Sequence, residues 1–369
     1  MARPEMTKDL AVFDEELSQL HMRGQWLYDA LLVKAIGGPQ PKGKPHIWKW
    51  DAVYPKLVEA CEAMPETFTA RRSLGLLNPG FERWGTTHTI SASIQMIRPG
   101  ELAWAHRHTI AALRFVIKGN KNVFTVVDGE ICPMEDYDLI LTPRWSWHDH
   151  HNETDEPAIW LDVLDLPFVM GLNATFYETY PRDRQQIRRE SKAEYLQARA
   201  KPLRPTWEKP KREHLPLRYR WADTESHLKR MAGLRGSLYD GLTLEYVNPM
   251  TGGPTLPTLS CWMHMLRPGE QTKPHRHTSS AIYLVIRGEG KTIVGEKELP
   301  WAKHDAFCIP NWAWHQHING SKTEEAILFS VNDIPMLRAF GLYREEPEDS
   351  LYSEEPPPIP KRKPSVSVL

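Results

Sequence analysis

Four histidines in the first half of the chain have a spacing that suits a metal site. His106 and His108 are separated by one residue, and His148 and His150 repeat this spacing further along the chain. In a β-strand, residues i and i+2 point to the same face, so each pair can direct two imidazoles to one side of a sheet. Imidazole is a common ligand of transition metals. Two such pairs on neighbouring strands therefore predict a metal centre.

The same pattern occurs a second time in the chain. His275 follows His106 by 169 positions, and His315 follows His148 by 167 positions. A nearly constant offset over both motifs indicates an internal duplication. The repeated pattern makes a second metal site a candidate, with the ligands His275, His277, His315 and His317.

Length and composition limit the class of protein. The chain has 369 residues, which suggests about two domains, and 41% of its residues are hydrophobic and 25% charged, as in soluble globular proteins. A net charge of −1 gives no support for a nucleic-acid partner. No apolar run is long enough to span a membrane. The four cysteines form no C-x-x-C motif and no secretory signal opens the chain, so we expect reduced thiols and a cytoplasmic location.

Three segments differ in character from the histidine-bearing parts of the chain. Residues 1–65 are expected to be helical, because residues 12–34 and 51–64 carry apolar side chains at helical spacing. We expect these helices to pack at an edge or a subunit interface. Residues 181–235 form a charged, proline-punctuated helical linker, and the proline-rich residues 346–369 are expected to be an extended arm or disordered.

The two remaining segments predict a mainly β fold. Residues 66–180 contain short β-rich runs separated by Gly, Pro and Asp, and residues 236–345 repeat this arrangement. Short strands at this spacing are typical of an antiparallel barrel or sandwich. We therefore expect two β domains, each with one set of histidines.

The repeated motifs resemble the two sequence motifs of the cupin superfamily. The first copy has Gly100, His106, His108, Pro143, His148 and Asn152, and the second has Gly269, His275, His277, Pro310, His315 and Asn319. The stretch AHRHTIAALRFVIKG and the N-terminal helices are similar to the gentisate 1,2-dioxygenase family, which includes salicylate and 1-hydroxy-2-naphthoate dioxygenases. The resemblance covers most of residues 65–345. It implies a bicupin, two tandem cupin β-barrels or jelly rolls with N-terminal and linker helices, assembled as a homotetramer.

One departure from the general cupin pattern concerns the ligand set. Most cupins place a Glu four or five residues after the H-x-H motif, whereas this chain has Ala112 and Leu113 there, and Ala281 and Ile282 in the second copy. A site of three histidines argues against oxalate decarboxylases and flavonol dioxygenases. Three neutral imidazoles leave an octahedral divalent iron with three open positions. A chelating substrate and O2 can fill them, and O2 chemistry favours Fe(II) over Zn(II).

The resemblance assigns roles to residues of the first domain. His106, His108 and His148 match the three metal ligands, and His150 becomes a substrate-contacting or acid–base residue. Arg114 lies an even number of residues after His108, so it shares the inward face and suits bidentate recognition of a substrate carboxylate. A structural ion pair is the alternative role for Arg114.

Further candidates surround this set. Asp162 interrupts an apolar run, so it needs a partner when buried, either His150 or Arg114. It could equally serve only to support the fold. Trp145 and Trp147 are expected to pack around the barrel mouth. The resemblance implies a further carboxylate contact from Arg71 or Arg72, and it implies that Gln95 faces the cavity. Small residues just before Gln95, among them Ser93, are expected to line the pocket and to leave room for a ring substituent.

The second domain lacks part of this constellation. Tyr283 stands where the first domain has Arg114, and Ser330 stands where it has Asp162. We therefore expect the second site to be able to bind metal but to be catalytically weak or silent.

The expected activity is Fe(II)-dependent cleavage of an aromatic ring by O2 in aromatic catabolism. The bond broken joins the carboxyl- and hydroxyl-bearing carbons of a 2-hydroxybenzoate. Gentisate is the commonest substrate of the family, while salicylate, 5-nitrosalicylate, other 5-substituted salicylates and 1-hydroxy-2-naphthoate are alternatives. Two other classes stay open: a cupin isomerase or hydrolase using Zn(II) or Mn(II), and a non-catalytic bicupin that binds a small molecule. The identity of the bound metal and the dependence on O2 separate these classes.

Overall fold

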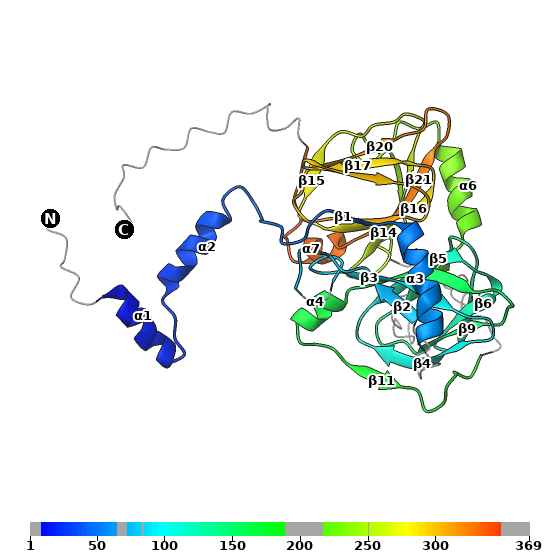
Figure 1. Ribbon diagram of the computed structural model, residues 1–369, viewed down its shortest axis with the longest axis horizontal. Coiled ribbons are helices and arrows are strands. Elements are labelled where there is room, and N and C mark those ends of the chain that lie inside the picture. Colours follow the sequence, from blue (N-terminus) through cyan, green and yellow to red (C-terminus); the bar gives the residue numbers. More distant parts are fainter. Residues whose placement is uncertain (1–8, 65–71, 83–84, 189–216, 250, 348–369) are drawn as a thin grey trace, which may run out of the picture. The chain divides into compact units, whose positions relative to one another are not determined.

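The computed structural model divides the chain into two compact units, Met1–Gln40 and Pro41–Leu369 (Figure 1). The residues that it describes are 9–64, 72–82, 85–188, 217–249 and 251–347. Most of the expected linker and almost all of the expected C-terminal arm therefore lie outside the described residues.

The N-terminal unit is built from short helices. Helix α1 (Leu10–Gln19) is followed by a 3₁₀ turn, η1 (Gln25–Tyr28), and by helix α2 (Asp29–Lys34). The side chain of Asp9 caps α1 by accepting a hydrogen bond from the backbone N–H of Ala11 at 2.8 Å. Residues 12–34 are thus interrupted rather than continuous, and the break includes a residue in the left-handed region, His21 with φ 54°.

The first barrel combines a six-stranded and a five-stranded antiparallel sheet, drawn mainly in cyan and green in Figure 1. The strand orders are β12-β8-β5-β10-β3-β2 and β11-β4-β9-β6-β7, and helix α4 (Leu166–Gly171) follows β10. The strands are β2 (Arg72–Gly75), β3 (Ser91–Ile97), β4 (Leu102–His108), β5 (Ala112–Lys118), β6 (Asn120–Val127), β7 (Glu130–Met134), β8 (Leu139–Thr142), β9 (His148–Asn152), β10 (Ala158–Leu164), β11 (Tyr177–Thr179) and β12 (Arg218–Tyr219).

The second barrel repeats this arrangement and is drawn mainly in yellow and orange in Figure 1. Its sheets have the orders β1-β19-β16-β21-β14-β13 and β18-β17-β20-β15-β22, and helix α7 (Ile334–Ala339) follows β21. The predicted mainly β bicupin is therefore confirmed. The strands are β1 (His46–Trp48), β13 (Leu242–Glu245), β14 (Ser260–Leu266), β15 (His275–His277), β16 (Ala281–Arg287), β17 (Gly290–Val294), β18 (Lys297–Trp301), β19 (Ala306–Ile309), β20 (His315–Asn319), β21 (Ala326–Asn332) and β22 (Glu345–Pro347).

In each barrel, one edge strand of the six-stranded sheet comes from the segment that precedes the other barrel in the chain. Strand β1 precedes the first barrel in the chain but pairs with β19 of the second, and β12 precedes the second barrel but pairs with β8 of the first. The boundaries expected near residues 65 and 235 did not anticipate this exchange. Covering a sheet edge in this way also protects it from pairing with other chains.

Strands β1 and β12 are each followed by a helix, and the two helices begin with the same kind of hydrogen bond. The backbone N–H of Trp50 at the start of α3 (Trp50–Ala63) donates to Asp305 at 2.8 Å, and that of Trp221 at the start of α6 (Trp221–Met231) donates to Asp138 at 2.8 Å. The two tryptophans are 171 positions apart and the two aspartates 167. The duplicated unit is therefore a strand, a helix and a barrel.

The six-stranded sheets of the two barrels pack against each other and share one hydrophobic core. At its centre Phe115 stacks on Phe329, with 4.0 Å between ring centroids. Two reciprocal hydrogen bonds also join the barrels. Thr89 Oγ1 donates to Asp333 Oδ2 at 2.5 Å, and Thr258 Oγ1 donates to Asp165 Oδ2 at 2.6 Å. These pairs are related by the duplication, so the barrels meet through equivalent surfaces.

The cysteines are buried thiols, and the described helices do not suit a bilayer. All four cysteines are free and buried, and burial raises the pKa of Cys61 and raises that of Cys308 to about 12. A raised pKa lowers the thiolate fraction and with it the reactivity of the thiol. No helix in the described part of the chain is long and apolar enough to cross a membrane.

We predict that Phe115→Ala lowers the free energy of unfolding by about 3–5 kcal/mol, because it opens a cavity in the core shared by the barrels. Urea unfolding followed by circular dichroism measures the change. Phe340→Ala is the matched control, because that ring is 62% exposed. Equal losses in the two variants would contradict a core shared between the barrels.

Candidate metal centre

Three of the predicted histidines meet inside the first barrel. Strand β4 carries His106 and His108, and β9 begins at His148, which lies opposite His106 in the antiparallel pairing. Their candidate ligand nitrogens all lie within 4.8 Å of one another, and all three side chains are buried. The pairing of β4 with β9 thus adds the third imidazole to the two that strand alternation places together.

Hydrogen bonds fix the tautomer of these imidazoles. Each Nδ1 lies 2.8–3.0 Å from a backbone carbonyl oxygen two residues away in the sequence. A carbonyl only accepts, so Nδ1 carries the proton and Nε2 keeps its lone pair for a metal. Nε2 of His148 is buried without a hydrogen-bond partner among the described residues. Burial and the neighbouring His106 and His108 lower the pKa of His148 well below its ordinary value, so the metal-binding neutral form prevails at neutral pH. The donor set fits a divalent transition metal.

The residue between the two ligands of β4 is held from the opposite face of the strand. The guanidinium of Arg107 lies 4.4 Å from the ring centroids of both Trp145 and Trp147. Its Nε and Nη2 donate to Glu178 Oε2 on β11 at 2.8 and 2.6 Å. Cation–π contacts and a charged hydrogen bond thus tie β4 to β11 and to the loop before His148. We call these four residues, Arg107, Trp145, Trp147 and Glu178, the arginine clamp.

The second barrel has the same clamp. The guanidinium of Arg276 lies 4.3 Å from the Trp312 ring and 4.7 Å from the Trp314 ring. It donates to Glu346 at 3.1 and 2.8 Å. Trp145 and Trp147 therefore pack on one particular side chain, Arg107, which the sequence analysis did not predict. The sequence could have indicated this contact, because H-R-H and W-x-W recur together in both repeats.

Arg114 and Asp162 form an ion pair on the interior face of the first barrel. Arg114 Nε lies 3.1 Å from Asp162 Oδ1, and Arg114 Nη1 donates to Thr142 Oγ1 at 2.9 Å. Trp160 Nε1 donates to the other carboxylate oxygen of Asp162 at 3.0 Å. Arg114, one of the two partners expected for Asp162, is therefore in contact with this carboxylate. Sequence reasoning missed Thr142 and Trp160, although Trp160 and Asp162 share one face of β10 by simple alternation.

His150 stands beside the triad without belonging to it. Its ring centroid is 5.9 Å from that of His148 and 5.6 Å from that of Trp160. Its Nδ1 lies 2.8 Å from Thr125 Oγ1, a contact that the sequence did not indicate. His150 is thus held between the triad and the tryptophan that contacts Asp162.

Two candidates on β3 also face the barrel interior. Ser93 lies opposite Asp162 and Gln95 opposite Trp160 in the pairing of β3 with β10. The side chain of Gln95 is buried, and its Nε2 has no hydrogen-bond partner in the part of the chain that the structure describes. A buried amide without a partner is costly unless another group meets it. This amide is therefore available to a bound ligand.

Arg72 is not brought to the triad. In the pairing of β2 with β3 it lies opposite Met96, which faces the core between the barrels rather than the barrel interior. Its Nη1 forms an ion pair with Glu101 at 2.6 Å. The predicted carboxylate contact of Arg72 is not supported, because the strand register turns it away from Gln95. Arg71 lies outside the described residues.

A second buried triad is formed by His275, His277 and His315, whose candidate ligand nitrogens also lie within 4.8 Å of one another. Nε2 of His315 has no hydrogen-bond partner among the described residues. His317 is the counterpart of His150, with Nδ1 2.9 Å from Thr292 Oγ1, and burial lowers its pKa to about 3. His317 therefore lies beside this triad, as His150 lies beside the first.

The interior wall of the second barrel differs from that of the first. Tyr283 lies opposite Ser330, as Arg114 lies opposite Asp162 in the first barrel. The predicted alignment of these two positions therefore agrees with the strand register. A neutral pair replaces an ion pair, so the second wall has no guanidinium for an anion at this position.

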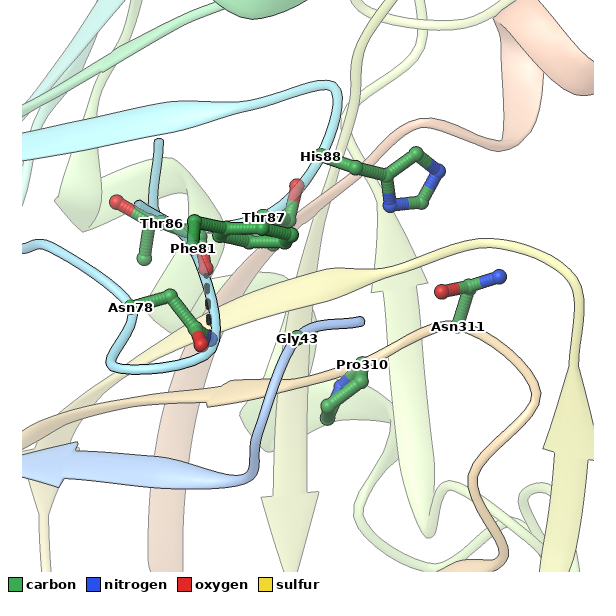
Figure 2. Close-up of a pocket in the computed structure, with 8 residues that line it drawn as sticks. All are labelled: Gly43, Asn78, Phe81, Thr86, Thr87, His88, Pro310 and Asn311. Atoms are coloured by element: carbon green, nitrogen blue, oxygen red, sulfur yellow. Dashed lines mark hydrogen bonds between the residues drawn. The ribbon is translucent and has the colours of Figure 1, made fainter. Parts of the chain in front are cut away.

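The structure also has a hollow of about 180 Å³, including its open mouth (Figure 2). Asn78 lies on one side of the hollow, and its Nδ2 donates a hydrogen bond to the carbonyl oxygen of Thr86 at 3.2 Å. No residue of this hollow belongs to either histidine set. The lining residues come from both barrels and the segment before β1: Gly43, Asn78, Phe81, Thr86, Thr87, His88, Pro310 and Asn311.

Comparisons with known proteins agree with this geometry. A family profile described as "Cupin domain" matches residues 93–164 and 262–332. The chain is 46% identical to 1-hydroxy-2-naphthoate 1,2-dioxygenase from Nocardioides sp. strain KP7, over 95% of this chain and 90% of that protein. It is 39% identical to 5-aminosalicylate 1,2-dioxygenase from Comamonas sp., over 92% and 90%. The crystal structure of salicylate 1,2-dioxygenase from Pseudoaminobacter salicylatoxidans with gentisate has a TM-score of 0.81 at 30% identity, over 94% and 96%.

We predict that Arg107→Ala weakens metal binding at the first triad by about 10–100-fold, the usual cost of removing a group that orients metal ligands. Competition with a chromophoric chelator measures the affinity, in a background where His277→Ala and His315→Ala remove the second triad. Arg182→Ala is the control, because Arg182 is exposed. An affinity equal to that of the control would rule out a positioning role for the clamp.

Proposed function

The chain belongs to the gentisate and salicylate 1,2-dioxygenase family of bicupin ring-cleaving enzymes, and from this we propose its substrate class, metal and site residues. The proposed reaction uses O2 to break the bond between the carboxyl- and hydroxyl-bearing carbons of an ortho-hydroxy aromatic acid, with both oxygen atoms entering the product. One observation carries this proposal: the interior of the first barrel contains both a histidine triad and the buried Arg114–Asp162 ion pair.

The proposed metal is Fe(II), held by His106, His108 and His148. Bound there, Fe(II) would supply coordination positions for the substrate oxygens and O2, together with the one-electron couple that O2 activation needs. The orphaned Nε2 of His148 and the neutral state of its ring support a cation at this place.

The proposed role of Arg114 is to bind the substrate carboxylate. Asp162 at Nε and Thr142 at Nη1 hold the plane of the guanidinium, which suits the planar geometry of a carboxylate. Asp162 is therefore a positioning residue in this proposal, and Trp160 fixes Asp162 in turn. A buried guanidinium also favours an anionic ligand more strongly than an exposed one.

His150 and Gln95 complete the proposed substrate site. Thr125 orients the His150 ring through Nδ1, and the proposed role of His150 is to take the proton of the substrate hydroxyl. Gln95 Nε2 would donate a hydrogen bond to a substrate oxygen. Ser93 keeps the wall beside them small, which leaves space for a ring substituent or a second ring.

We propose 1-hydroxy-2-naphthoate and gentisate as the first substrates to test. The former is named for a relative that matches 95% of this chain at 46% identity, and the latter for a Haloferax relative at 40% identity over 81%. Salicylate and 5-substituted salicylates present the same adjacent carboxylate and hydroxyl groups.

The proposed assembly is a cytoplasmic homotetramer. Apolar side chains of the N-terminal unit are exposed in the single chain and could be covered by a second copy. They include Leu10, Val12, Trp26, Leu31, Leu32 and Ile36.

The function is tested by loading the protein with Fe(II) without air and then admitting air with each aromatic acid. We expect uptake of one O2 per substrate cleaved, together with a new ultraviolet absorbance from a conjugated acid. Metal analysis confirms that iron is bound. Iron-loaded protein that consumes no O2 with any of these acids would contradict the dioxygenase proposal, and would favour a Zn(II) or Mn(II) cupin enzyme or a binding protein.

Arg114→Lys is expected to lower kcat/KM by about 10–100-fold with iron content unchanged, since a bidentate charged hydrogen bond is worth about 1.5–3 kcal/mol. The lysine keeps a positive charge beside Asp162, which limits damage to folding. Lys118→Ala, at the exposed end of the same strand, is the control. Steady-state O2 uptake gives both constants, and an unchanged kcat/KM would remove Arg114 from the substrate site.

A further inference from the structure

A carboxylate lies beside the second triad. Asp240 Oδ1 is 3.9 Å from His275 Nε2, the ring nitrogen remote from the backbone. Asp240 belongs to the loop between α6 and β13, and only 18% of its side chain is exposed. Such a carboxylate is well placed to meet a cation held by the triad, either directly or through a bound water.

The loop that carries Asp240 is fixed to the second barrel. The N–H of Lys273, two residues before His275, donates to the carbonyl of Leu238 at 2.8 Å. The hydroxyl of Ser237 donates to the second oxygen of Asp240 at 3.1 Å, and the Tyr239 ring lies 5.3 Å from the His275 ring. The loop therefore holds its carboxylate next to the triad.

The first repeat has no carboxylate at the corresponding place in its sequence. Leu242 lies opposite Met265 in the second barrel, as Arg72 lies opposite Met96 in the first. Counting back two residues from this pair reaches Asp240 in the second repeat and Ala70 in the first. The two repeats thus share their triad histidines, but their sequences differ at this position.

Two positions on the wall around the second triad carry neutral side chains in place of the ion pair of the first barrel. The Tyr283 ring stacks on Phe307 with 4.8 Å between centroids. His264 Nε2 lies 2.8 Å from Ser330 Oγ, so this hydroxyl is already hydrogen-bonded. Neither position offers the guanidinium that Arg114 provides in the first barrel.

We propose that a second metal centre is formed by His275, His277, His315 and Asp240. This centre binds a divalent cation but does not bind the aromatic acid. Asp240 takes the anionic place next to the cation that the substrate carboxylate takes in the first barrel. One carboxylate reduces the net charge of the centre from +2 to +1 and repels a second anion. The buried Nε2 of His315 has no hydrogen-bond partner in the described residues, and the candidate ligand nitrogens of the triad lie within 4.8 Å of one another. The inference rests on the proposed function only for the identity of the excluded acid.

Cobalt(II) tests the proposal, because its visible spectrum reports ligands without any need for turnover. His106→Ala with His148→Ala leaves only the second triad, and His277→Ala with His315→Ala leaves only the first. We expect each protein to bind one Co(II) per chain in equilibrium dialysis. Gentisate should change the visible spectrum of the first-triad protein and leave that of the second-triad protein unchanged.

Asp240→Asn is the decisive variant, made in the protein that keeps only the second triad. We expect a loss of Co(II) affinity of about 10–100-fold, as for other groups that tune a metal site. Asp223→Asn is the matched control, since Asp223 is an exposed carboxylate on α6. Circular dichroism verifies that each variant is folded.

Three results would overturn the inference. They are a folded second-triad protein that binds no Co(II), an Asp240→Asn affinity equal to that of the control, and a gentisate-induced spectral change in the second-triad protein. Absence of O2 uptake by the wild type would defeat the proposed function alone. The Co(II) stoichiometry and the effect of Asp240→Asn do not depend on turnover, so the two failures are distinguishable.

Discussion

The burial of one face of each six-stranded sheet against the other is the constraint on which both sites depend. Leu113, Phe115 and Leu161 point into this shared core. Because side chains alternate along a strand, the residues between them must point into the barrel interior. Arg114 and Asp162 are therefore brought together by the packing of their hydrophobic neighbours. The packing of apolar side chains between the two sheets thus determines where the polar side chains lie inside the barrel.

The exchange of edge strands makes the two barrels interdependent. Neither six-stranded sheet is complete without β1 or β12, each of which comes from the segment before the other barrel. The reciprocal bonds from Thr89 and Thr258 strengthen the same junction. A displacement of one barrel would thus disturb strands and hydrogen bonds of the other. The two repeats therefore form one compact unit, although each has its own histidines.

Duplication preserved the metal-binding scaffold and allowed the surroundings to diverge. Both repeats keep the triad and the arginine clamp, which depend on local strand geometry. The differences lie at positions that determine charge: Arg114 and Asp162 in the first barrel, Tyr283 and Asp240 in the second. An anionic ligand is favoured beside a guanidinium and opposed beside a carboxylate. The same fold can therefore support one metal centre that binds an anionic substrate and one that does not.

The sequence alone determined the features that have a local period or an exact repeat. The H-x-H spacing predicted the imidazole pairs, the constant offset predicted two barrels, and the apolar run around Asp162 indicated a buried charge that needed a partner. The tertiary structure decided what depends on strand register and on long-range pairing. Register turned Arg72 away from the triad and selected Arg114 as the partner of Asp162. Contacts between distant segments placed β1 on the second barrel and Asp240 beside His275. Alternation fixes that neighbouring residues face opposite sides, but only packing decides which side becomes the interior.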